Sequence, residues 1–159
     1  MGYNFGVGRE APQFDLTAHD GSRVTLKQYR GDWFALVCFL GADPAAAAAA
    51  VTALSAVADE LWGLRGQLVG IVAGDEQLLQ AVAADAGRAD FPLLADPGNT
   101  VARAYGAYDA AAAKVRRYVA IVDRSGKIVW TADGAEAAGV VEPAVAPAAV
   151  VAGLKDIAR

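Results

Sequence analysis

Few side chains in this 159-residue chain could carry out chemistry, and two of them are single examples of their kind. Cys38 is the one cysteine and His19 the one histidine. A lone thiol excludes a disulfide within the chain, and the two residues are too few to form a zinc site. We therefore expect no metal and no other cofactor, and the chemistry left to test is a thiol nucleophile, an imidazole base or a charged binding pocket.

Cys38 could act as a nucleophile only as a thiolate. It lies in the apolar run from Trp33 to Leu40, which has the pattern of a strand that is buried on both faces. Free cysteine is among the most buried residue types, and apolar surroundings favour the unreactive thiol. We interpret Cys38 as a core residue. His19 stands beside the turn signal Asp20-Gly21, and we interpret it as a solvated turn histidine and not as a base.

The charge of the chain argues against nucleic acid as its main partner. The formal net charge is −4 and the pI is near 4.9, whereas phosphate binding needs clustered lysine and arginine. The nearest basic cluster consists of Lys114, Arg116 and Arg117, and it is too small for that purpose.

The hydrophobic fraction of 55% does not indicate a membrane protein, because alanine supplies much of it. The most apolar stretch, residues 33–54, carries Gly41, Asp43 and Pro44 near its middle, so we read a strand, a turn and a helix. Residues 1–12 show no basic segment followed by an apolar run. We therefore expect no membrane association and a cytoplasmic location.

The hydrophobic periodicity predicts strands that alternate with helices. Strands are expected at residues 14–18, 23–26, 33–40, 68–73, 91–95, 118–122 and 127–131. Helices are expected at about 44–65, 76–86, 100–105 and 148–157, with Asp43 and Asp75 as N-caps and a loop over 132–147. This order indicates a single α/β domain over residues 1–159, with a mixed sheet covered on both faces.

Five segments, in this order and spacing, match a known family. They are Ala11-Pro12-Gln13-Phe14-Asp15-Leu16, Asp20-Gly21 to Tyr29-Arg30-Gly31, Phe91-Pro92-Leu93-Leu94-Ala95-Asp96-Pro97, Val101-Ala102-Arg103-Ala104-Tyr105-Gly106, and Ile121-Val122-Asp123-Arg124-Ser125-Gly126-Lys127-Ile128. The chain resembles the peroxiredoxins of the alkyl hydroperoxide reductase and thiol-specific antioxidant group, especially the small bacterioferritin-comigratory type. The resemblance implies a thioredoxin-like fold with a central mixed β-sheet, helices on both faces and an N-terminal hairpin.

The catalytic signature of that family is missing. The family places Pro-x-x-x-Thr/Ser-x-x-Cys after its third strand, and these positions fall here on Gly41, Ala45 and Ala48. A shift by one or two residues changes nothing, because residues 45–50 are all alanine. The Cys-x-x-Cys of thioredoxins would fall near Pro44 and Ala47, so that motif is absent too.

An arginine of the family's site is matched. The resemblance places at Arg117 the arginine that holds the thiolate in the family's "R-x-T-F-V-I-D" strand, with Val119 in place of the threonine and Arg116 as the competing register. Arg117 and the N-terminus of the helix after Pro44 could together bind an anion. The alternative is an ion pair between Arg117 and a carboxylate such as Asp43, and both interpretations stay open.

Two functions follow from the resemblance and the missing motif. The leading hypothesis is a peroxiredoxin-like protein that has lost thiol peroxidase activity and serves as a binding or interaction module for a small molecule or a protein. The alternative is a residual thiol-dependent antioxidant or oxidoreductase activity through Cys38, which would need an external thiol because no resolving cysteine exists. The resemblance also makes a homodimer a candidate assembly.

Two further features have structural explanations. The alanine run at 45–50 could line a partner surface or be an altered segment, but we favour a native small-residue helix face against the sheet, since alanine also clusters at 110–113. Trp33, Trp62 and Trp130 are interpreted as packing in the core or at its rim.

Overall fold

A five-stranded mixed β-sheet forms the centre of the protein in the computed structural model, which describes residues 7–29, 31–87, 89–115, 118–133 and 147–157. Its strand order is β5-β4-β3-β8-β9. The bounds are β3 (Phe34–Gly41), β4 (Gly66–Val72), β5 (Leu93–Ala95), β8 (Tyr118–Val122) and β9 (Ile128–Asp133). Strands β3, β4 and β5 run parallel, and β8 and β9 are antiparallel to their neighbours. The predicted mixed sheet is confirmed, with the apolar run at its centre.

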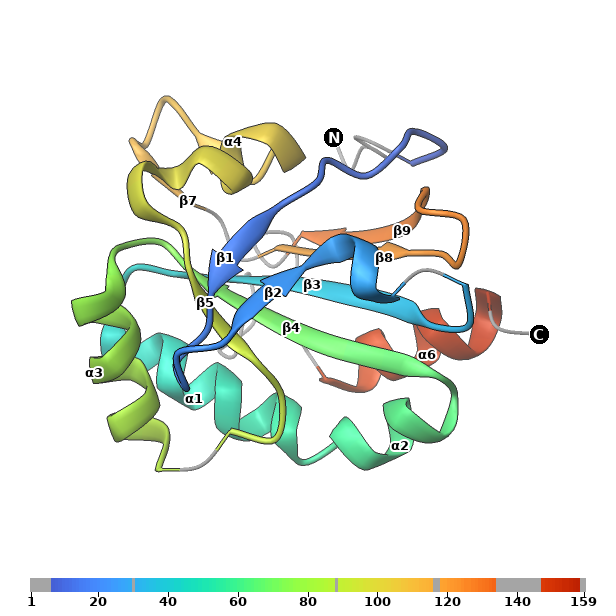
Figure 1. The fold of residues 1–159 in the computed structure, drawn as a ribbon, viewed down its shortest axis with the longest axis horizontal. Helices are drawn as coiled ribbons and strands as arrows, with labels where there is room; N and C mark the ends of the chain where they lie inside the picture. Colours follow the sequence, from blue (N-terminus) through green and yellow to red (C-terminus); the bar gives the residue numbers. More distant parts are fainter. Residues whose placement is uncertain (1–6, 30, 88, 116–117, 134–146, 158–159) are drawn as a thin grey trace.

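The two faces of the sheet carry different elements (Figure 1). Alternate residues of β3 face opposite ways, so Leu36 and Cys38 pack in one hydrophobic cluster and Val37 and Phe39 in the other. The first cluster takes side chains from α1 (Pro44–Ser55), α2 (Ala58–Gly63), α3 (Glu76–Ala86) and α6 (Pro147–Ile157). The second takes them from the hairpin β1 (Asp15–Thr17) and β2 (Arg23–Thr25), from η1 (Leu26–Tyr29), from α4 (Thr100–Tyr105) and from β7 (Lys114–Val115). Helices therefore cover both faces, as the sequence predicted.

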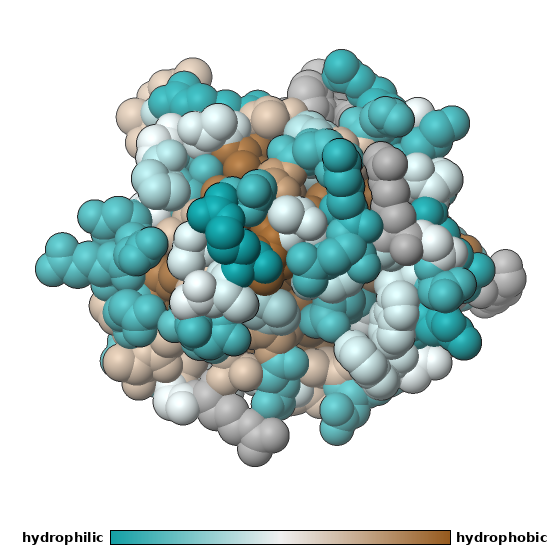
Figure 2. Space-filling model, in the orientation of Figure 1, coloured by the Kyte–Doolittle hydropathy of each residue, from teal (hydrophilic) through white to brown (hydrophobic). Residues whose placement is uncertain are grey.

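The N-terminal hairpin crosses the sheet on the second face. Its turn is the predicted one: Gly21 has a φ of +88°, and Asp20 Oδ1 accepts a hydrogen bond of 2.9 Å from the backbone N–H of Ser22. Figure 2 shows that polar side chains cover much of the face carrying this hairpin, with strongly hydrophobic residues visible between them near the centre and weakly hydrophobic ones at the rim. The hairpin thus closes one side of the core.

The helix expected over residues 44–65 is two helices, so that prediction was wrong. Val57, with φ −111° and ψ 4°, leaves the helical conformation between α1 and α2, and its carbonyl then accepts from Leu61 N–H. The second helix contacts β4 and α6, and it buries Leu61 beneath the sheet. No glycine or proline marks residues 56–57, so the alanine-rich periodicity concealed the break.

Shorter elements were also missed. The hairpin of β6 (Tyr108–Asp109) and β7, and the 3-10 helices η1 and η2 (Pro97–Asn99), are too short to show a period in the sequence. Most of the predicted loop at 132–147 lies outside the described residues. None of the helices in the described ranges is long and apolar enough to cross a bilayer.

Candidate functional site

The site in question is the junction where β3 ends and α1 begins. Gly41 closes the strand with a φ of +81°, and its carbonyl accepts a 2.9 Å hydrogen bond from the N–H of Ala73 on the neighbouring segment. Proline has a ring that fixes φ near −65°, so it cannot adopt this backbone conformation. Position 41, where the family motif has proline, therefore has a left-handed backbone conformation in this chain, which glycine adopts readily.

The two other motif positions lie on α1 in different environments. Ala45 is exposed, whereas Ala48 is 6% exposed and belongs to the cluster beneath the sheet together with Ala47 and Ala50. The small-residue face of α1 thus packs against the sheet, as predicted. A thiol in place of Ala48 would point into apolar surroundings, where the neutral form is favoured.

Cys38 is a core residue, as predicted. Its side chain is 0% exposed in the middle of β3, between Gly70 of β4 and Val119 of β8 in the pairing register. The thiol Sγ lies 3.7 Å from the carbonyl oxygen of Leu36, the one hydrogen-bond acceptor that it has among the described residues. Burial raises the pKa of the Cys38 thiol to about 12, so the thiolate is almost absent at neutral pH.

The charged pair proposed for the site is described only in part. Arg117 and the competing Arg116 lie outside the described residues, while Tyr118, the next residue, pairs with Phe39 of β3. Asp43 has the extended backbone of an N-cap, but its exposed side chain makes no capping hydrogen bond. The predicted cap is thus present in backbone only, and the anion pocket stays a prediction.

His19 is not a solvated turn residue, so that interpretation was wrong. Its backbone N–H donates to the carbonyl of Leu93 at 2.8 Å, and its Nδ1 accepts from the N–H of Leu93 at 3.2 Å. Its own carbonyl accepts from Nε2 of Gln80 on α3 at 3.0 Å. The half-buried imidazole therefore fastens the hairpin tip to strand β5 and α3, which is a structural role that the turn signal alone could not reveal.

Of the three tryptophans, Trp33 and Trp130 are half-buried at the rim, as predicted, but Trp62 is 56% exposed. Leu61 and Trp62 are neighbours on α2, and neighbours on a helix point about 100° apart. With Leu61 fully buried, Trp62 turns outward, and its ring centroid lies 4.4 Å from that of Trp33.

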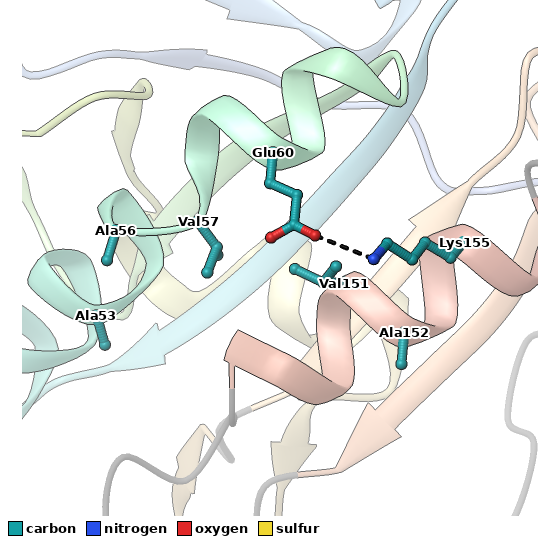
Figure 3. A pocket seen from close by; sticks show the side chains of 7 residues that line it. All are labelled: Ala53, Ala56, Val57, Glu60, Val151, Ala152 and Lys155. Atoms are coloured by element: carbon teal, nitrogen blue, oxygen red, sulfur yellow. Dashed lines mark ion pairs between the residues drawn. The ribbon is translucent and has the colours of Figure 1, made fainter.

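A groove of about 580 Å³ lies on the helical face, between α1–α2 and α6. Its lining is mostly alanine and valine: Ala53, Ala56, Val57, Val151 and Ala152, with Glu60 and Lys155. Figure 3 shows these last two side chains reaching toward each other from α2 and α6, and their Oε2 and Nζ atoms are 3.1 Å apart. The ion pair joins the two helices. Among the described residues, no three carboxylate, histidine or cysteine side chains gather as a metal site would require.

Comparison with known proteins agrees with this architecture. The model of the AhpC/TSA family matches residues 7–131, which is most of the chain. The chain belongs to the AhpC/TSA family. No curated protein matches this AhpC/TSA protein in sequence.

Solved structures with the same fold as this AhpC/TSA protein are peroxiredoxins. The reduced 2-Cys peroxiredoxin of Plasmodium vivax has a TM-score of 0.80 at 20% identity, over 97% of this chain and 82% of that one. Peroxidoxin BcpB of Mycobacterium tuberculosis has a TM-score of 0.78 at 20% identity, over 97% and 99%. AhpC of Enterococcus faecalis has a TM-score of 0.80 at 20% identity, over 98% and 93%. At this identity the likeness establishes the peroxiredoxin-type thioredoxin fold, and function must be argued from the site.

Proposed function

We propose that this AhpC/TSA protein has no thiol peroxidase activity and acts as a binding or interaction module. The observation that carries the proposal is the environment of its only thiol: Cys38 is fully buried in the central strand, and burial raises its pKa to about 12. A peroxidatic cysteine must be a thiolate that a peroxide can reach. Cys38 meets neither condition.

The junction after β3 supports the same proposal. The motif positions hold Gly41, Ala45 and Ala48, none of which has an ionisable or hydrogen-bonding side chain. Without a thiol or a hydroxyl, none of the side chains at these three positions can attack a peroxide or donate a hydrogen bond to one. The scaffold is retained while its chemistry is lost.

A hydroperoxide-consumption assay tests the proposal. The full chain is given hydrogen peroxide or an alkyl hydroperoxide with dithiothreitol, and separately with thioredoxin and its reductase. We expect the rate to equal that of the matched Cys38→Ser variant and of the reductant alone. Turnover at a peroxiredoxin-like rate that disappears in Cys38→Ser would establish the alternative, a residual thiol-dependent peroxidase.

Anion binding at the start of α1 is the second candidate. It is supported by a helix of twelve residues whose first turn holds no acidic side chain and whose N-cap residue, Asp43, leaves the N–H groups without a side-chain partner. Inorganic phosphate should then raise the melting temperature of the wild type but not of Arg117→Ala. An equal rise in both proteins would remove Arg117 from the proposal.

The proposal also includes a cytoplasmic location and a homodimer as candidate assembly. Cell fractionation tests the first. Light scattering after size exclusion tests the second, and a monomer at all concentrations would contradict it.

A further inference from the structure

Trp62 leaves a large aromatic ring open to solvent at one end of the sheet. It lies near the end of α2 and packs on Trp33, just before β3, with the two rings inclined by 46°. In Figure 1 this end, where α2 leads into β4, lies opposite the end where β3 runs into α1. We call Trp33, Trp62 and the neighbouring Asp32 and Asp59 the Trp62 platform.

The ring of Trp62 is held in place although it is exposed. Its contact with the half-buried Trp33 restricts its rotamers, so a ligand that stacks on the outer face loses little additional side-chain entropy. Trp62 and Val7 are the two large hydrophobic residues that are exposed in the described part of the chain. A braced, exposed tryptophan of this kind is a typical anchor for a binding partner.

The charges beside the ring select the kind of partner. Asp59 lies three residues before Trp62 on α2, on the same side of the helix, and Asp32 directly precedes Trp33. Both carboxylates are exposed, and neither forms an ion pair with another described residue. Lys155 is already paired with Glu60, and Arg65 follows α2 in the sequence. The guanidinium of Arg124 lies over the ring of Phe34, 5.1 Å from its centroid. The platform therefore combines an electron-rich ring with two exposed carboxylates that have no ion-pair partner among the described residues.

We propose that the Trp62 platform binds an arginine-bearing segment of a partner protein. A guanidinium group is planar and weakly hydrated, so it stacks on a tryptophan ring better than an ammonium group does, and its edge can donate hydrogen bonds to the carboxylate of Asp59 or Asp32. A second copy of this chain is a poorer occupant, because a two-fold axis through the platform would bring its own carboxylates together.

This surface is separate from the β3–α1 junction, so the inference goes beyond the proposed function and does not depend on the outcome of the peroxide assay. The Trp62 platform would be the binding surface of the module, and an arginine side chain of the partner would be its ligand.

The test uses the full chain and a fluorescein-labelled peptide of alternating arginine and glycine, with the matched lysine and glutamate peptides. Fluorescence anisotropy should show binding that is strongest for arginine, weaker for lysine and absent for glutamate. Trp62→Ala should weaken binding of the arginine peptide by about three- to tenfold, and Trp62→Phe should fall between the two. Because the side chain is more than half exposed, both variants should keep the circular dichroism spectrum and melting temperature of the wild type.

Asp59→Asn provides the charge test, and Glu76→Gln its matched control. Glu76 is an exposed acidic residue in the first turn of α3, so both substitutions remove one negative charge from a helix start. Only Asp59→Asn should weaken binding. Equal losses in the two variants would mean non-specific attraction to an acidic protein, and an unchanged affinity in Trp62→Ala would overturn the proposal. Self-association that Trp62→Ala abolishes would assign the surface to a second copy and would also overturn it.

Discussion

Cys38 and Tyr105 are ionisable side chains in the interior, and both are held neutral by burial. Cys38 lies on one side of the sheet and Tyr105 on the other, where the Tyr105 hydroxyl donates to the carbonyl of Pro12 at 2.8 Å. Burial raises the pKa of both groups, and among the described residues the thiolate or phenolate would have no positive partner to compensate for lost hydration. Ionisation of either group would therefore lower the stability of the fold.

The pKa of Cys38 predicts how stability depends on alkaline pH. It rises from an ordinary 9.0 to about 12 on folding, so the unfolded chain releases the thiol proton first. The contribution of Cys38 to the free energy of unfolding is thus complete below about pH 9 and is lost between about pH 9 and 12, by at most about 1.4 kcal/mol per pH unit. Urea unfolding of the wild type should show this slope, and Cys38→Ala should lack it.

Tyrosines in the unfolded chain ionise near pH 10, but they do so in both proteins, so the difference between the two slopes isolates Cys38. Parallel slopes for the two proteins would contradict the buried thiol. A thiol reagent gives an independent check, because Cys38 should react slowly in the native protein and quickly in denaturant.

His19 gives the second prediction at the residue scale. His19→Phe removes the acceptor for the Leu93 N–H and should lower the free energy of unfolding by about 1 kcal/mol. His19→Asn, which keeps a side-chain acceptor, should lose less. The Leu93 amide should also exchange its hydrogen faster in His19→Phe, while the amide of Gly70, bonded to the carbonyl of Pro92, should not change. An unchanged Leu93 exchange rate would exclude the bond.

At the scale of elements, helices with a specific stop were predictable and helices without one were not. The helix α3 has the predicted bounds, because Asp75 Oδ1 accepts from Leu78 N–H at its start and Gly87 ends it with a φ of +74°. The break between α1 and α2 has no such residue. It depends on which side chains the sheet can accept, and that is tertiary information.

The same limit applies to the candidate site. The loss of the motif at Gly41, Ala45 and Ala48 was visible in the sequence, and so was the buried strand around Cys38. The conformation of Gly41 was not visible, since glycine adopts many backbone angles. The exposure of Trp62 was also hidden, because α2 buries either Leu61 or Trp62 and the sequence does not show which of the two faces the core.

Two glycines near the end of α2 give a matched test of packing. A Cβ on Gly66 would overlap Leu154 Cδ2 of α6 and would lie 2.9 Å from Leu36 Cδ1, whereas a Cβ on Gly63 would have no neighbour within 4 Å. Gly66→Ala should therefore destabilise the fold by about 1 to 3 kcal/mol. Gly63→Ala, on a helix, should be neutral or stabilising by less than about 1 kcal/mol. Chemical denaturation measures both, and equal effects would contradict the close approach of α6.

At the scale of the whole molecule, the sheet separates the two candidate surfaces. The β3–α1 junction lies at the C-terminal end of β3, and the Trp62 platform lies at its N-terminal end (Figure 1). The strand between them is buried without interruption from Phe34 to Leu40. Substitutions at one end should therefore leave binding at the other unchanged.

Restoring the family cysteine alone should not restore activity. In Ala48→Cys the new thiol enters the apolar cluster beneath the sheet, so we expect no peroxidase turnover and a stability loss of about 1 kcal/mol from the larger side chain.

Gly41→Pro should lower the free energy of unfolding by about 3 kcal/mol or more, because proline cannot reach a φ of +81°. Gly41→Ala is the control: the site has room for a Cβ, so the loss should stay near about 1 to 2 kcal/mol. A peroxide assay and urea unfolding measure these outcomes, and rapid turnover by Ala48→Cys would contradict the burial of that position.

The left-handed backbone conformation of Gly41 also affects which substitutions this protein can accept during evolution. A chain with the full family motif would differ from this one at several positions, and a proline at position 41 would lower the stability of the fold before a thiol was in place. Selection acts on one substitution at a time, so each intermediate would be a less stable protein with no new activity. The backbone conformation of Gly41 thus limits the order in which substitutions at this junction can accumulate, whereas exposed surface residues can change without this cost.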